Sequence, residues 1–316
     1  MSKQLGLAEA LVAPGFGRNA RLERITALID WAPLERLMAP LHTAQTGRPP
    51  YASLSLFKGL LLQQWYGLSD PGLEEALGDR ASFRFFCGFG LSEAVPDETT
   101  FCRFRGALAQ AGLAEALFAE INRQLDAKGF IVKRGTLLDA TLVRAAVQPP
   151  RPEDGPLAPA RDPDAAWAAR ANPKKTTYGY KAHVAADQGP RGLIRKALLT
   201  PANIHDSTPA DDLVQGDEGA VYGDRAYDKA ERRQDLRRRG IKDRIMHRAP
   251  RGRPLDPHRR RRNRLIAKIR ATVEGIFGTW KRGYGYVRVR YRGLLRNHAH
   301  LQILCIAFNL RRAIAC

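Results

Sequence analysis

The sequence TLLDATLV, at residues 136–143, decides the fold. It is rich in leucine, valine and threonine, and this composition is typical of a strand that lies inside a sheet. Asp139 stands in its middle, and a carboxylate is costly to bury unless a partner neutralises it. Asp139 is therefore either a residue of an edge strand that faces water or a functional carboxylate within a sheet.

Downstream of this strand, patterns typical of strands and helices alternate. A hairpin and two short strands are expected at residues 178–186, 193–199, 220–223 and 241–246. Helices are expected at 207–215 and up to Gly240, and Asn263 is suited to cap a long helix. Residues 301–310 are apolar almost all round and predict a buried closing helix. This order predicts an α/β domain at residues 131–316, with a mixed sheet flanked by helices.

Residues 1–130 contain helical patterns and little strand-like alternation. The stretch at 53–66 is strongly apolar, and Asp97 is placed to cap a later helix. Residues 113–128 form another helical pattern, which Gly129 ends. We expect an all-helical N-terminal domain here. In a basic protein it is either a module that binds DNA ends or a plain helical support, and the two interpretations carry equal weight.

Two segments of the α/β domain have unusual compositions. The segment 148–176 holds seven prolines, which predicts an irregular surface loop that cannot join the sheet. The segment 231–264 holds 15 lysines and arginines against four acids. Its charges repel one another unless an anion lies against them, although a solvated basic face is the plain alternative.

The whole chain is strongly basic. Its 316 residues include 52 Lys and Arg against 32 Asp and Glu, a net charge of +20. Its 44% of hydrophobic residues argues against wholesale disorder, and no uncharged apolar run approaches the roughly 18 residues of a membrane-spanning helix. Its four cysteines form no CxxC pair, which disfavours a zinc site and fits a cytoplasmic location. Nucleic acid is the first candidate partner, and we expect no membrane.

A second candidate carboxylate is Asp224, which directly follows the strand-like AVYG. Ligands of open α/β sheets bind beyond the carboxyl ends of strands, so this position is suggestive. Asp224 could instead cap the next helix, but Asp228 is placed to do that. Asp187 in a turn and Asp206 at a helix start have ordinary structural duties by comparison.

A third candidate is Glu274, the only acid after Asp256. On the predicted long helix it shares a face with Arg270, four residues earlier, and with Lys281, seven residues later. A plain ion pair with Arg270 would contribute only about 0.3–0.5 kcal/mol. That explains the pair but leaves the isolation of the acid unexplained.

Together, Asp139, Asp224 and Glu274 could converge in a basic cleft. Three carboxylates suit two divalent ions about 3.5–4 Å apart, which stabilise an in-line displacement at phosphorus. Oxygen ligands favour Mg²⁺ or Mn²⁺ over zinc. Phosphate contacts are expected from four consecutive basic residues of the segment 231–264, Arg259, Arg260, Arg261 and Arg262.

Several longer blocks are familiar: LFKGLLLQQWYGLSDPGLEEAL and FRFFCGFG in the helical part, LLDATLV, PANIHDS and GDRAYD in the α/β part, and YRGLLRNHAHLQILCIAFNLRR at the end. RATVEGIFGTWK places Arg270, Glu274 and Lys281 at the intervals Arg, three residues, Glu, six residues, Lys. From about residue 45 onward the chain resembles DDE transposases of bacterial insertion sequences, of the type grouped as families four and five. One departure is Ala267, where that third block has Tyr.

The resemblance implies a ribonuclease H-like catalytic domain that hydrolyses DNA at the ends of a mobile element and transfers the 3′-hydroxyl ends into target DNA. It implies metal binding by Asp139, Asp224 and Glu274, and phosphate contacts from Arg270 and Lys281. Pairing two ends implies a homodimer on DNA. The loss of the Tyr at Ala267 could weaken cleavage.

Three hypotheses remain open at this point. The chain is a transposase that binds terminal inverted repeats, a metal nuclease that cuts without joining, or a DNA-binding regulator without catalysis. The regulator accounts for the charge but not for Asp139 or the solitary Glu274.

Overall fold

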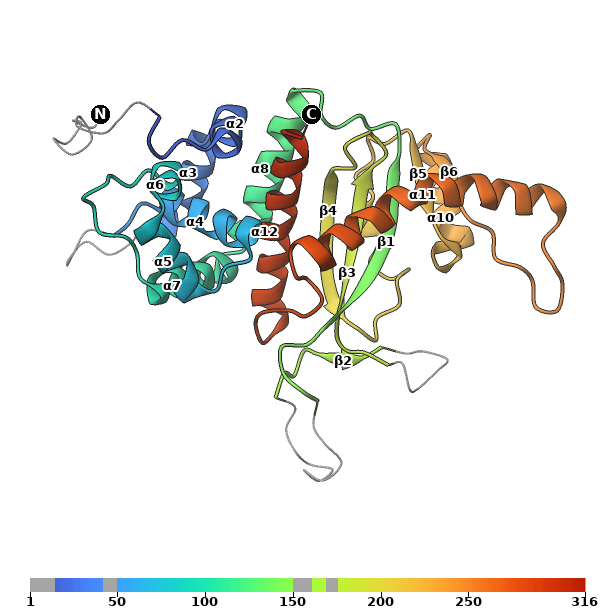
Figure 1. Cartoon of the computed structure of the whole chain (residues 1–316). Coiled ribbons are helices and arrows are strands. Elements are labelled where there is room, and N and C mark those ends of the chain that lie inside the picture. Colours follow the sequence, from blue (N-terminus) through green and yellow to red (C-terminus); the bar gives the residue numbers. More distant parts are fainter. Residues whose placement is uncertain (1–14, 42–49, 150–160, 169–175, 316) are drawn as a thin grey trace. The chain divides into compact units, whose positions relative to one another are not determined.

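The computed structural model describes residues 15–41, 50–149, 161–168 and 176–315. It divides into two compact units (Figure 1). One is a helical unit, Met1–Gln124 with Gln302–Cys316, and the other is an α/β unit, Leu125–Leu301. No described helix is both long and apolar enough to cross a lipid bilayer.

The described part of the first unit is helical. Its elements are α2 (Ala20–Leu28), α3 (Ala32–Met38), the 3₁₀ helix η1 (Ala39–Leu41), α4 (Ser53–Tyr66), α5 (Asp70–Asp79), α6 (Ala81–Cys87), α7 (Glu98–Gln110) and α8 (Leu113–Ala127). Asp97 caps α7 as predicted, because its side chain accepts a hydrogen bond from the Thr100 N–H at 2.7 Å.

The end of the chain belongs with this helical unit. The last helix, α12 (Leu294–Ala313), continues past Leu301 into it. There the indole N–H of Trp65 donates to the Ala307 carbonyl at 2.8 Å, and the Asn309 amide donates to that of Asn122 at 2.8 Å. Buried polar groups paired in this way fix the register of α12 against its neighbours.

The α/β unit is built on a mixed six-stranded sheet of order β2-β3-β1-β5-β6, with β4 also paired to β3. Its strands are β1 (Thr136–Arg144), β2 (Ala166–Trp167), β3 (Tyr178–Asp187), β4 (Ile194–Pro201), β5 (Ala220–Gly223) and β6 (Lys242–Ile245). The pairs of β3 with its neighbours are antiparallel, whereas β5 runs parallel to β1 and β6. The predicted hairpin is β3–β4, in which Asp187 accepts hydrogen bonds from Val132, Lys133 and Gly189.

Helices cover both faces of this sheet, as predicted. They are α9 (Ala210–Leu213), the 3₁₀ helix η4 (Arg225–Tyr227), α10 (Ala230–Arg238) and α11 (Pro257–Gly283). Leu138 of β1 packs in a core with Leu213 of α9 and Leu236 of α10. The next residue, Asp139, pairs with Arg270 of α11. Because neighbouring residues of a strand point to opposite faces, α11 lies on the other face, and Figure 1 shows it crossing the sheet.

Two local expectations were wrong. The long helix begins at Pro257, where Asp256 caps it by accepting from the Arg259 N–H at 2.8 Å. Asn263 does not cap a helix, because its amide bonds both backbone groups of His247. The proline-rich segment does contribute to the sheet, since Trp167 pairs with Tyr178 through β2. No proline stands between 163 and 173, so the backbone there keeps its donors. Most of that segment, at 150–160 and 169–175, lies outside the described residues.

Candidate active site

Asp139 and Asp224 stand level on two neighbouring parallel strands. β1 and β5 pair through Thr136 with Val221 and through Leu137 with Tyr222. Each aspartate follows the second of these pairs by two positions, and β5 ends at Gly223. The structure therefore brings these two predicted site residues together at the carboxyl end of a parallel strand pair, where ligands of α/β sheets bind.

Asp139 is largely buried, with 19% of its side chain exposed. Its Oδ2 lies 2.9 Å from Nη2 of Arg270, and its Oδ1 accepts from the Ala140 N–H at 2.9 Å. The pKa of Asp139 is raised to about 6, mainly by burial and also by the charges of Asp224 and Asp206, against the opposing charge of Arg270. A carboxylate crowded by like charges in this way is suited to bind a cation.

Asp224 itself caps the following helical turn, although Asp228 was the expected cap. Its Oδ1 accepts from the Ala226 N–H at 2.7 Å and caps η4. Asp228 instead pairs with Arg233 at 2.8 Å and accepts from the Arg248 N–H. A carboxylate has two oxygens, so capping through Oδ1 leaves Oδ2 of Asp224 for a ligand.

Glu274 lies on α11, which packs against both β1 and β5. It is exposed and stands one turn beyond Arg270, which is buried against Asp139. Among the described residues, no group of three acidic, histidine or cysteine side chains is close enough to hold a metal ion. The third carboxylate thus lies on the helix that covers the two aspartates but does not join them. Arg270, which we expected to contact phosphate, neutralises Asp139 instead.

The residues present fit a hard divalent cation. Asp139 and Asp224 offer carboxylate oxygens, the ligands that Mg²⁺ and Mn²⁺ prefer. Two buried polar atoms near them, the Tyr227 hydroxyl and Nε of Arg270, have no hydrogen-bond partner among the described residues. Burial raises the pKa of the Tyr227 hydroxyl, and the negative charges of Asp139, Asp206 and Asp224 raise it as well. The hydroxyl oxygen of Tyr227 can accept a hydrogen bond, which a water bound to a metal ion would supply.

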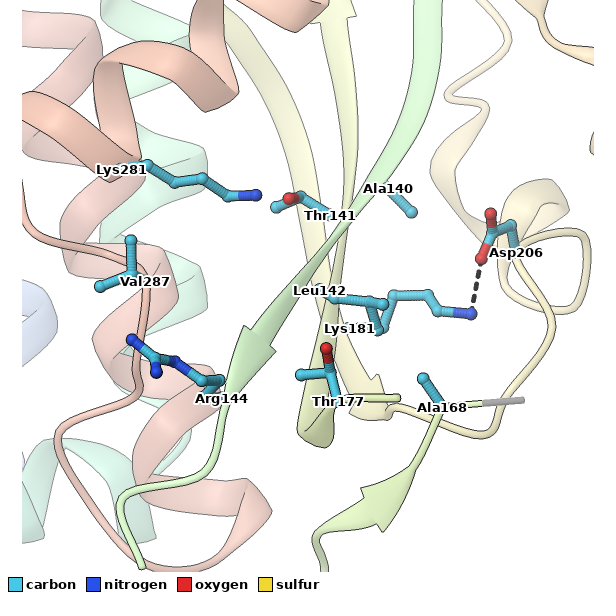
Figure 2. A pocket seen from close by; sticks show the side chains of 10 residues that line it. All are labelled: Ala140, Thr141, Leu142, Arg144, Ala168, Thr177, Lys181, Asp206, Lys281 and Val287. Atoms are coloured by element: carbon cyan, nitrogen blue, oxygen red, sulfur yellow. Dashed lines mark ion pairs between the residues drawn. The ribbon is translucent and has the colours of Figure 1, made fainter. Parts of the chain in front are cut away.

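A cleft of about 620 Å³ adjoins Asp139 along β1 (Figure 2). The described residues that line it are Ala140, Thr141, Leu142, Arg144, Ala168, Thr177, Lys181, Asp206, Lys281 and Val287. Figure 2 shows Lys281 reaching in from α11 toward Thr141 and Lys181 reaching toward Asp206. Lys281, which the resemblance implies contacts phosphate, thus lines the cleft that adjoins Asp139.

Sequence reasoning missed Lys181 and misread Asp206. Asp206 caps no helix, because α9 begins at Ala210 without a side-chain cap. Its Oδ1 instead lies 2.7 Å from Nζ of Lys181 in the cleft. The signal for Lys181 was weak, since a lysine in YGYKAHVAA has no visible partner along the chain. The pairing of β3 with β1, which sets Lys181 opposite Leu142, gives it its place.

Several arginines of the segment 231–264 are fastened within the protein. Arg232 bonds Asp211 and the Ser207 carbonyl, and Arg233 bonds Asp228 and Asp243. Arg262, one of the expected phosphate contacts, bonds the Ile245 carbonyl at 2.7 Å and the Asp243 carbonyl at 2.8 Å. The sequence suggested that this segment needs an external anion, but part of its charge is neutralised internally.

The other three expected contacts, Arg259, Arg260 and Arg261, are exposed near the start of α11. Arg259 pairs with Asp256 at 3.2 Å, and Arg260 donates to the Leu255 carbonyl at 3.0 Å. Both contacts are on the surface, where ion pairs contribute little and yield readily to another anion.

Comparison with known families identifies the class of protein. Residues 131–310 match the transposase DDE domain, and residues 14–107 match a transposase domain (DUF772). No solved structure is significantly similar to this one. The first match covers more than half of the chain, so the protein belongs to the transposase DDE domain family. The two matches together show a DDE transposase of insertion sequences, as the sequence motifs indicated.

Proposed function

We propose that this transposase binds the terminal inverted repeats of its insertion sequence, hydrolyses DNA at the ends and transfers the 3′-hydroxyl ends into target DNA. The observation that carries the proposal is the level placement of Asp139 and Asp224 on parallel strands, under a helix that bears Glu274. We further propose that residues 131–316 have a ribonuclease H-like fold and that residues 1–130 bind DNA ends.

In this proposal Asp139, Asp224 and Glu274 hold two Mg²⁺ or Mn²⁺ ions. Such ions, when bound, stabilise the attacking and leaving oxygens at phosphorus. Asp139 and Asp224 are held by β1 and by the η4 cap, so they need little rearrangement. Glu274 is exposed and pairs with no described side chain, so a rotamer change can turn it toward the aspartates.

The cations of α11 have complementary roles. Arg270 neutralises Asp139. A metal ion bound to Asp139 would supply that positive charge, and the Arg270 guanidinium would then be available to a phosphate. Lys281, at the cleft, binds the DNA strand beside the cut. Ala267 is exposed one turn before Arg270, where the third block of these transposases has Tyr, and we propose that its small side chain removes one DNA contact. Binding two ends at once requires a homodimer on DNA.

The test is cleavage of linear DNA that carries the element's ends, with Mg²⁺, with Mn²⁺ and with EDTA. Glu274→Gln is expected to lose cleavage by more than about 100-fold while DNA affinity persists, since even second-shell changes at metal sites cost about 10–100-fold. Glu231→Gln, which removes an exposed acid of α10, is the matched control. Unimpaired cleavage by Glu274→Gln would remove Glu274 from the site.

The same assay separates the alternatives. A pre-cleaved end with a free 3′-hydroxyl is joined to target plasmid by a transposase but not by a plain metal nuclease. A DNA-binding regulator shows no metal-dependent cleavage in any form. Cleavage without joining would replace the proposal with the nuclease, and binding without cleavage would replace it with the regulator.

A further inference from the structure

Among the described residues, part of one edge of β1 has no strand partner beside the candidate active site. Its pairing with β5 covers only Thr136 and Leu137. Farther along, the Arg144 N–H donates to the Val287 carbonyl at 3.1 Å, and the Arg144 carbonyl accepts from Val289 at 2.8 Å. The backbone groups of Arg144 thus point away from β3. In an antiparallel strand, successive residues direct their backbone N–H and C=O groups alternately toward and away from the neighbouring strand. The backbone groups of Leu142, two residues before Arg144, therefore also point away from β3 and into the cleft.

Cations flank this edge from both faces of the sheet. Lys181 stands opposite Leu142 and so shares the face of Leu138, which α9 and α10 cover. Lys281 comes from α11 on the other face, and Arg144 closes the far end. Within the described residues, neither Lys281 nor Arg144 pairs with an acid. Thr141 and Thr177 add hydroxyls to the lining.

Lys181 is held in a fixed position. Its side chain is only 15% exposed, and its ammonium lies 2.6 Å from the Ile204 carbonyl and 2.7 Å from Asp206. An ammonium has three donors, so one remains to meet a ligand in the cleft. Since a lysine loses much side-chain freedom when it is fixed, two contacts that fix it in advance favour binding.

We propose that this cleft binds the sugar–phosphate backbone of one DNA strand, with Lys181, Lys281 and Arg144 contacting successive phosphates. The inference rests on the proposed function, which makes DNA the polyanion. Leu142 lies three residues beyond Asp139, or about 10 Å along the strand. For a DNA strand that runs along β1 with a rise of about 3.4 Å per nucleotide, this spacing places Lys181 about three nucleotides from the cut.

Asp206 sets the strength of this contact. Its carboxylate holds Lys181 but also repels a phosphate. If Asp206 is neutralised, the Ile204 carbonyl still holds the lysine while the repulsion is lost. The cleft therefore predicts opposite effects for the two partners of one ion pair, whereas substitution of either partner would be expected to act in the same direction if the pair only stabilised the fold.

The experiment measures the affinity of the full chain for a fluorescein-labelled 20-base-pair duplex in EDTA, across a salt titration. Each lost phosphate contact lowers the slope of log K against log salt by about 0.9, which is about tenfold in affinity at 0.1 M salt. Lys181→Gln is expected to show this loss, and Lys181→Arg to restore the slope. Asp206→Asn is expected to bind several-fold more tightly. Lys242→Gln, the same charge change on the exposed face of β6, is the control.

Two results would overturn the inference: a slope for Lys181→Gln equal to that of Lys242→Gln, or weaker binding by Asp206→Asn. Tighter binding cannot come from misfolding, so the second variant decides even if the first is unstable. Binding in EDTA is independent of cleavage. If the protein cleaves DNA but Lys181→Gln leaves the salt slope unchanged, the proposed function stands and the role of this cleft is refuted. If Lys181→Gln lowers the slope but the protein does not cleave DNA, only the proposed function is refuted.

Discussion

Two basic regions of the α/β unit differ in what their charge does. The segment 231–264 has the higher charge density, yet Arg232, Arg233 and Arg262 bond carboxylates and carbonyls of the same unit. The cleft along β1 has only three lining cations, two of which pair with no acid among the described residues. The difference teaches that a run of arginines in a sequence does not measure the charge available to DNA.

The chemistry of the side chains explains the difference. A guanidinium presents five donors in a planar fork, which suits carbonyls at strand ends as well as it suits phosphate. Arg233 uses this fork to join Asp228 to Asp243 of β6. An ammonium is a compact charge, and Lys181 keeps its place in the cleft through two short contacts. The buried arginines of the segment 231–264 fasten the fold, whereas two of the three cations named in the cleft are lysines.

The largest expected effect is on stability, in the arginine-rich segment. Arg233→Ala removes the cation that joins Asp228 to Asp243, both mostly buried, and leaves Asp243 only the more distant Arg262 at 3.7 Å among the described residues. Breaking such a pair from one side costs about 3–5 kcal/mol of the free energy of unfolding. Urea denaturation checks this, with Arg238→Ala as control, because Arg238 is exposed and pairs only with Asp235 nearby. Weaker DNA binding without a loss of stability would contradict the comparison.

The exposed part of the same segment is expected to behave in the opposite way. Replacing Arg259, Arg260 and Arg261 together by Gln leaves the fold intact, because these side chains make only surface contacts. If all three contact phosphates, the slope of log K against log salt falls by about 2.7. A salt titration of DNA binding measures it, and Arg238→Gln controls for net charge. An unchanged slope would confine DNA to the cleft.

The acid pair at the site predicts a pH dependence. Asp139 must be ionised to bind a cation, and burial raises its pKa to about 6. The cleavage rate is therefore expected to fall by about tenfold per unit as the pH drops below 6. Arg270→Gln removes the charge that lowers this pKa, so the acidic limb moves to higher pH. A pH–rate profile of both proteins measures the shift, and coincident limbs would mean that Asp139 does not control the rate.

The same pKa has a consequence for folding without metal. The ordinary value for Asp139 is 3.8 and the folded value is about 6, so the folded state binds the proton more tightly than the unfolded chain. Its contribution to stability is present below pH 4 and is lost as the pH rises through 6. Asp139→Asn is expected to flatten this part of the stability profile in EDTA.

How much of this site the sequence predicts depends on the range of the interactions. Asp139 and Asp224 are predictable because each is marked by its own strand, and parallel strand ends meet at one edge of a sheet. The helical periodicity of α11 places Arg270, Glu274 and Lys281 on one side. The sequence alone cannot say that Arg270 points at Asp139, because that contact depends on how far α11 is rotated against the sheet.

The remaining errors arise where several residues compete for one duty. Asp256 and Asn263 are both suitable caps, and the choice between them depends on His247, which occupies Asn263. Asp206 is of a residue type that often caps helices, but its side chain pairs with Lys181 of β3. Such choices are decided by partners distant in the chain, so local patterns do not settle them.

The smallest expected effect concerns the cap that begins the exposed basic turn of α11. Asp256 accepts a hydrogen bond from the Arg259 N–H, and this bond and the Arg259 charge lower the pKa of Asp256. Asp256→Ala is expected to lower the free energy of unfolding slightly, because it removes this helix cap. It also removes the ion pair that competes with phosphate for Arg259, so DNA binding at low salt is expected to tighten slightly. Thermal unfolding and a salt titration of one variant measure both. Weaker binding would show that the ordered helix start provided by Asp256 matters more for DNA binding than the negative charge of Asp256. The arginine-rich segment would then resemble the cleft, in that both would bind DNA through a preformed arrangement.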